Sequence, residues 1–246
     1  MTSSSTIPEV KEITELRDRI TQRAEQIFKD EWARKITELD KFLNQGPEKQ
    51  PLIEVDEVAS SVRNSVPTSI QIYADAGTKR RRTDADSHEE VSSEQSRPVI
   101  PANQAVLDLA DKVKRELHVM CESVAIVKMY VQLNVPPAST GDNFGVSVQE
   151  DIIGELSRAE ESGLGVFDHI SRYHISRGKV LSKIIKYPGI QDYVKAVMEM
   201  DEKEIINLKN TCLEIRNNYF ILRDLIIKNL DKIKMPRKKF QASAMY

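Results

Sequence analysis

The sequence has little cysteine, little net charge and no long apolar run, and each shortage argues against a class of protein. Two cysteines among 246 residues cannot form a disulfide framework, and no apolar run follows a basic start, so we expect a reducing compartment and no secretory signal. No stretch of about 20 apolar residues is present to span a membrane. The net charge of −2 predicts no global positive field. We therefore expect neither a membrane nor a nucleic acid as a partner.

Patterns that carry catalysis or bind metals are also missing. The histidines share no metal-ligand spacing, and HExxH and paired CxxC patterns are absent. Cys212 falls on the apolar seam of a predicted helix, which is typical of an inert buried thiol rather than a nucleophile. The many acidic residues are typical of solvated helix faces. We expect no enzyme activity, no metal site and no cofactor.

What the chain does have is charge, at 30% of its residues, with only 6% aromatics and 9 glycines, a composition that favours long solvated helices over sheets. Four segments show the three- and four-residue apolar spacing of amphipathic helices. They end near proline or glycine, because proline cannot continue a helix without losing a backbone hydrogen bond. The segments run from about Pro8 to Asn44, from Pro101 to the Pro136–Pro137 pair, from Val148 to Tyr187 and from Gly189 to near Pro236. We predict an all-α, four-helix up-down bundle.

The seams of these segments carry further expectations. In the first segment the apolar stripe shifts in phase between Ile27 and Trp32, and in the third it is interrupted at Glu160 and Arg177. The glycines of the third segment weaken it, and we expect close packing between helices to account for some of them. The last segment has a main seam of Ile205, Leu208, Cys212, Ile215, Tyr219, Leu222 and Ile226, and a second row of Ile206, Leu213, Phe220 and Ile227. Two rows predict apolar partners on more than one side of this helix.

A long insert separates the first two predicted helices. Residues 46–100 are rich in Ser, Asp, Glu, Pro and Gln, and the second half lacks the apolar residues that would offset the entropy of ordering. We expect most of this insert to be disordered. It contains a basic cluster, Lys79, Arg80, Arg81 and Arg82, which is a candidate nuclear localisation signal, although four like charges can also serve only to keep a disordered segment soluble.

Several short motifs resemble one known family. The turn after the second helix reads GDNFGVSVQED over 141–151 and follows KMYVQLNVPP over 128–137. Further along come ISRYHISRGK (170–179), KYPGIQDY (186–193) and KNLDKIKMPR (228–237), in the order of the family. The chain resembles the 11S regulators, which cap the proteasome core particle. It is most similar to the gamma type, because its insert has the KRRR cluster and lacks the alternating Lys/Glu tract of the alpha type.

The resemblance implies a quaternary structure and a partner. The bundle, formed by residues 1–45 and 101–246, is expected to assemble into a homoheptameric ring with a central channel. The ring would dock on the outer α ring of the 20S core particle without using a nucleotide. The alternative that the sequence leaves open is a nuclear coiled-coil adaptor that binds its partners through the insert.

Two elements are expected to share the work of activation. Pro236 ends the last helix, so residues 237–246 form an arm whose terminal Met245 and Tyr246 can enter a pocket of the core particle. The resemblance identifies residues 134–146 as the activation loop, which would displace the gate of the core particle. The residues of that loop expected to matter are Gly141, Asp142, Asn143, Phe144 and Gly145, with Asn143 as the first choice for gate contact.

Three lysines of the third helix form a further hypothesis. Lys179, Lys183 and Lys186 fall on one helical stripe, where they would line the channel of the ring. Their charge would then select among passing peptides.

Overall fold

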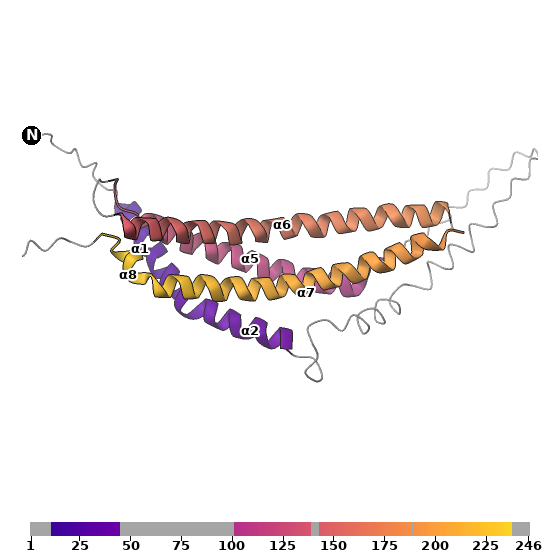
Figure 1. Ribbon diagram of the computed structural model, residues 1–246, viewed down its shortest axis with the longest axis horizontal. Coiled ribbons are helices and arrows are strands. Elements are labelled where there is room, and N and C mark those ends of the chain that lie inside the picture. Colours follow the sequence, from indigo (N-terminus) through magenta and orange to yellow (C-terminus); the bar gives the residue numbers. More distant parts are fainter. Residues whose placement is uncertain (1–10, 45–100, 139–142, 188, 238–246) are drawn as a thin grey trace, which may run out of the picture. The chain divides into compact units, whose positions relative to one another are not determined.

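The computed structural model describes residues 11–44, 101–138, 143–187 and 189–237, and every regular element in these ranges is a helix (Figure 1). The helices are α1 (Lys11–Gln26), η1 (Ile27–Glu31), α2 (Trp32–Asn44), α5 (Gln104–Leu133), α6 (Phe144–Lys186), α7 (Gln191–Lys228) and α8 (Leu230–Lys234). The all-α prediction is confirmed. Within these ranges no helix combines the length and the apolar character that crossing a membrane requires. The insert and its basic cluster, Lys79, Arg80, Arg81 and Arg82, lie outside the described residues.

The chain divides into two compact units. Unit 1 comprises Met1–Gln45, Lys114–Val166 and Thr211–Tyr246, and unit 2 comprises Gly46–Val113 and Phe167–Asn210. The contacts within each unit run antiparallel along the sequence. In unit 1, Trp32 meets Ser123 whereas Lys35 meets the earlier residue Glu116. These pairings agree with the predicted up-down topology.

The predicted phase shift in the first helix has a structural cause. Residues Ile27–Glu31 form a π turn, in which the N–H of Trp32 donates to the carbonyl of Ile27, five residues earlier. The wider turn takes up one extra residue, so Ala24 before it and Leu39 after it are both buried. The helix from about Pro8 to Asn44 is thus one rod with a local change of pitch over its described part.

Aromatic side chains fill the core of unit 1. The Trp32 and Tyr219 ring centroids are 5.9 Å apart, and those of Phe28 and Tyr130 are 6.0 Å apart. The indole N–H of Trp32 donates to the hydroxyl of Ser123 at 3.0 Å, which satisfies the one polar group that this buried ring carries. Each large aromatic buried in this way contributes about 2 to 3 kcal/mol of hydrophobic stabilisation.

The main seam of α7 is buried as predicted, and Cys212 on it is fully enclosed. The second row is covered only in part within the described residues: Ile206 and Leu213 are half-buried, whereas Phe220 is 61% exposed and Ile227 is 41% exposed. The described part of the chain therefore leaves the later half of this face of α7 uncovered.

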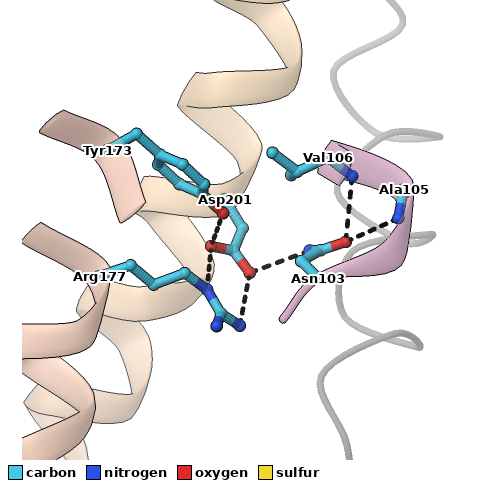
Figure 2. Close-up of polar contacts among 6 residues, drawn as sticks. All are labelled: Asn103, Ala105, Val106, Tyr173, Arg177 and Asp201. Carbon is cyan, nitrogen blue, oxygen red and sulfur yellow. Dashed lines mark hydrogen bonds and ion pairs between the residues drawn. The ribbon is translucent and has the colours of Figure 1, made fainter. Parts of the chain in front are cut away.

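The interruptions of the α6 seam are ion pairs. Glu160 pairs with Lys128 of α5 in unit 1. In unit 2 the buried Arg177 donates from Nε and NH2 to the two carboxylate oxygens of Asp201 on α7, at 2.9 and 3.2 Å (Figure 2). Asp201 is fully buried and also accepts from the hydroxyl of Tyr173 at 2.7 Å. A buried charge needs such partners because leaving it unpaired costs several kcal/mol.

Asn103 connects this network to the start of α5 (Figure 2). Its side-chain amide donates to Asp201 at 2.9 Å, and its side-chain oxygen accepts from the backbone N–H of Ala105 at 3.1 Å and of Val106 at 3.4 Å. Asn103 is therefore the N-cap of α5, which satisfies backbone donors that the first helical turn leaves unpaired. A small apolar cluster centred on Ile184 and Val197 completes unit 2.

Candidate functional site

The predicted activation loop is shorter in the structure than residues 134–146. Helix α5 ends at Leu133, residues 135–138 are non-helical, and α6 already begins at Phe144. The N–H of Ser147 donates to the carbonyl of Asn143 at 2.9 Å, which makes Asn143 the N-cap position of α6. Phe144 and Gly145 are therefore helical rather than loop residues, and the third helix starts four residues before the predicted Val148. Gly141 and Asp142 lie outside the described residues.

Gly145 is needed for close packing against Pro236. It is buried against Pro236, and a Cβ atom at this position would lie 2.0 Å from the carbonyl oxygen of Pro236. Real Cβ atoms do not approach a backbone oxygen so closely. Any side chain at position 145 would thus push the chain after α8 away from the start of α6.

Two further contacts tie α8 and the residues after it to the same turn. The guanidinium of Arg237 donates to the side-chain oxygen of Asn143 at 3.1 Å, across 94 positions of sequence. The ammonium of Lys232 lies 4.8 Å from the ring centroid of Phe144, whose side chain is 64% exposed. The base of the predicted docking arm therefore lies directly against the predicted gate-contact residue. Met245 and Tyr246 themselves lie outside the described residues.

A buried glutamine that the sequence analysis did not single out holds this arrangement in place. The side-chain amide of Gln149 donates to the carbonyls of Asn134 and Ile233, at 3.0 and 2.8 Å. One side chain on α6 thereby satisfies backbone oxygens at the end of α5 and on α8. Gln149 lies on the same stripe as the buried Ile152 and Leu156, so a polar residue at a seam position is the signal that could have identified it.

The turn also borders an open surface pocket of about 390 Å³. It is lined by Val135, Pro136, Ala138, Asn143, Val146, Ser147, Glu150 and Arg237. Four apolar side chains thus lie beside four polar ones, of which Asn143, Ser147 and Arg237 can donate hydrogen bonds and Glu150 can accept them. This composition suits recognition of a polypeptide segment, in which apolar contacts supply affinity and a few polar groups fix orientation.

The three lysines of α6 are described, and all are exposed. The ammonium of Lys183 lies 5.5 Å from the ring centroid of Tyr193, and that of Lys186 lies 5.2 Å from that of Tyr187. Such cation–π contacts at exposed sites contribute about 0.5 to 1 kcal/mol. The location of Lys179, Lys183 and Lys186 in a channel stays a prediction.

Two features of the described ranges bear on catalysis: the possible metal ligands and the Cys121 thiol. Within residues 11–44, 101–138, 143–187 and 189–237, no three His, Cys, Asp or Glu side chains converge as metal ligands. Burial raises the pKa of the partly exposed Cys121 thiol, and the nearby Glu160 carboxylate raises it further. A raised pKa disfavours the thiolate that a nucleophilic cysteine requires.

Comparison with known proteins gives a single family. The family model for the C-terminal part of the proteasome activator PA28 matches residues 99–243, and the model for its N-terminal part matches residues 8–54. The chain belongs to the PA28 family of proteasome activators. The PA28 models cover the whole turn, α8 and the contact between them.

Individual relatives agree with the family models. Human proteasome activator complex subunit 3 is 38% identical over 97% of this chain and 96% of its own length. That relative is the gamma type, as the resemblance implied. The crystal structure of the 11S subunit of the Plasmodium falciparum proteasome, PA28, superposes with a TM-score of 0.75 at 28% identity, over 97% of this chain and all of that one.

A more distant structure shares the fold alone. A chain from the archaeal 20S proteasome in complex with mutated P26 activator superposes with a TM-score of 0.67 at 15% identity, over 95% of this chain and 98% of that one. The PA28 fold of long antiparallel helices is thus retained where few residues are.

Proposed function

We propose that this chain is a subunit of an ATP-independent activator of the 20S proteasome. Seven copies form a ring, the carboxy-terminal arms dock on the outer α ring of the core particle, and the turn before α6 opens the gate. The single observation that carries this proposal is the contact of Arg237 and Pro236 with Asn143 and Gly145. The arm therefore leaves the bundle beside the turn, so one surface presents both elements to one partner.

The uncovered face of α7 supports self-assembly. Phe220 and Ile221 are 61% and 56% exposed, and a pocket of about 460 Å³ beside Phe220 is lined by Ile36 of α2 and by Arg216. Large exposed apolar side chains on a soluble helix mark an interaction surface. A second copy of this chain is the occupant we propose, because a repeated head-to-tail contact closes into a ring when the rotation between copies divides a full turn.

The ring also explains how short arms could bind tightly. One arm of ten residues buries little surface, but after the first arm docks the others face a high effective concentration, which raises avidity by about 10² to 10⁴. Gate opening then requires that the turn bind the open gate better than the closed one, since equal binding would shift nothing. Asn143, exposed at the N-cap of α6, is the residue we assign to this contact.

Stimulation of a purified core particle tests the proposal. The chain should have the native mass of about seven subunits and should increase hydrolysis of short fluorogenic peptides by the core particle without nucleotide, while showing no peptidase activity alone. Removing Met245 and Tyr246 should abolish binding. Asn143→Tyr should leave binding intact and remove stimulation. A stable monomer without effect on peptide hydrolysis would overturn the proposal, and a mass of two to four subunits would favour the adaptor.

We further propose that the chain acts in the nucleus, with the cytoplasm as a secondary location, on the basis of the Lys79, Arg80, Arg81 and Arg82 cluster. Replacing these four residues with alanine in a fluorescently tagged chain should move the signal to the cytoplasm. Unchanged nuclear accumulation would show that the cluster serves only solubility.

A further inference from the structure

The contact between Arg237 and Asn143 has a consequence for the gate. Asn143 directly precedes α6, and its carbonyl accepts from the backbone N–H of Ser147 at 2.9 Å. Its side chain is the part that would meet a partner. A side-chain amide on an exposed turn has several rotamers, and ordering one of them on binding costs free energy that a pre-formed contact avoids.

The donor of this contact is itself well anchored. Ile233 of α8 is fully buried, and its carbonyl accepts from the buried Gln149 at 2.8 Å. Lys234 of the same helix pairs with Glu25 of α1 at 2.7 Å. Pro236 then lies against Gly145. Arg237 thus emerges from a fixed base, so its guanidinium can hold the Asn143 amide in one orientation.

We infer that Arg237 is a positioning residue for gate opening: it orients Asn143 while the residues beyond it, 238–246, supply the docking. The inference rests on the proposed function, because orienting Asn143 matters only if Asn143 contacts the gate of the core particle. It separates two roles within one arm. The end of the arm sets how tightly the ring binds, and the base of the arm sets how well the bound ring activates.

The separation is measurable as a split between binding and stimulation. Arg237→Ala should reduce stimulation at saturating ring concentration by about five- to tenfold, since a hydrogen bond from a charged group is lost. Affinity for the core particle, measured by surface plasmon resonance, should change by less than about twofold, a difference within the scatter of near-neutral contacts. Arg237→Lys keeps the charge but not the fork of donors, and should restore stimulation only in part.

Lys228→Ala is the matched control, because it removes a positive charge from the end of α7, where Lys228 forms an exposed pair with Asp224, but no contact that holds Asn143 or the base of the arm. It should retain stimulation close to wild type. If Lys228→Ala and Arg237→Ala lose stimulation equally, general charge attraction explains the effect and the inference fails. An Arg237→Ala ring that stimulates like wild type also overturns it.

A double substitution tests whether Arg237 acts through Asn143 rather than through a general effect on folding. If Arg237 acts through Asn143, the Arg237→Ala substitution should have no further effect in an Asn143→Ala background. Additive losses would overturn the inference. The wild-type chain assayed beside these variants separates failure of the proposed function from failure of this inference. If the wild-type chain does not stimulate the core particle, the proposed function is wrong. If it stimulates normally but the losses of the two substitutions add, only the role of Arg237 is wrong.

Discussion

The two units of the chain bury different chemistry. Unit 1 has an aromatic core, with Phe28, Trp32, Tyr130 and Tyr219 enclosed, and its ion pairs lie at or near the surface. In unit 2 the centre is ionic, because Asp201 is fully buried with Arg177. Apolar packing tolerates small shifts between helices, whereas a carboxylate with four donors fits one register only.

The difference agrees with where the candidate site lies. The turn, α8 and the base of the arm all belong to unit 1, where aromatic packing and Gln149 fix them. Unit 2 contains the start of α5 directly after the insert, and there the Asn103 cap joins the ionic network. Apolar packing thus supports the candidate site in unit 1, whereas the four donors to Asp201 in unit 2 meet it in one helix register.

We expect the largest effect from a substitution that disrupts the ionic centre of unit 2. Asp201→Ala removes the partner of Arg177 and leaves a buried guanidinium unpaired, which should lower the free energy of unfolding by about 3 to 5 kcal/mol. Urea unfolding at one fixed protein concentration would measure this loss.

Asp224→Ala is the matched control for Asp201→Ala. It breaks an exposed pair with Lys228 on the same helix and should change stability by less than about 1 kcal/mol. Equal effects of the two substitutions would show that the buried network does not stabilise unit 2.

The next effect uses pH to test the aromatic core of unit 1. Burial, with a smaller contribution from Glu25, raises the pKa of the Tyr130 hydroxyl to about 12. An unfolded tyrosine ionises near pH 10, so the stabilisation is complete below pH 10 and is lost as the pH rises from about 10 to 12. The free energy of unfolding should fall by about 2 to 3 kcal/mol over this pH range because of Tyr130 alone.

Comparison with Tyr130→Phe isolates this titration from that of the lysines. The variant should lose less stability than wild type between pH 9 and 12 in urea unfolding. Parallel curves for the two proteins would mean that Tyr130 ionises normally in the folded chain.

The two units also differ in how their buried tyrosine hydroxyls are hydrogen-bonded at neutral pH. The Tyr173 hydroxyl in unit 2 donates to Asp201, whereas the Tyr130 hydroxyl has no hydrogen-bond partner among the described residues. Tyr173→Phe should therefore cost about 2 kcal/mol, because a bond to a charged group is lost, and Tyr130→Phe should be neutral or stabilising. Thermal unfolding of both variants would reveal the order, and a larger loss for Tyr130→Phe would contradict it.

Much of the fold could be predicted from the apolar periodicity of the sequence, and the features that could not be predicted have physical reasons. The seam of α7 and the phase shift in the first helix could be predicted, because burial of one stripe imposes the 3.6-residue period. The early start of α6 could not be predicted, since Asn143 caps a helix whose first turn contains a glycine. That glycine is required by its close contact with Pro236, which is distant in the sequence.

The polar contacts show the same limit. Periodicity marked Arg177 as an interruption but could not name Asp201 and Asn103 as partners, because a pairing between distant helices depends on register rather than on spacing. At the candidate site the motif singled out Asn143 and Gly145. The contacts of Arg237 and the role of Gln149 required the three-dimensional arrangement.

The smallest effect compares two glycines of α6, one in each unit. A Cβ at Gly163 in unit 1 would lie 2.9 Å from the sulfur of Cys121 and 3.2 Å from the methyl of Met120, whereas a Cβ at Gly178 in unit 2 would meet nothing within 4 Å. Gly178→Ala should stabilise the chain by about 0.5 to 1 kcal/mol, because alanine loses less backbone entropy in a helix. Gly163→Ala gains the same entropy but must move the Cys121 side chain, so we expect a net loss of about 1 kcal/mol. Thermal unfolding of the two variants should therefore shift in opposite directions. Equal upward shifts would show that α5 and α6 have room at Gly163, and that close packing does not account for this glycine.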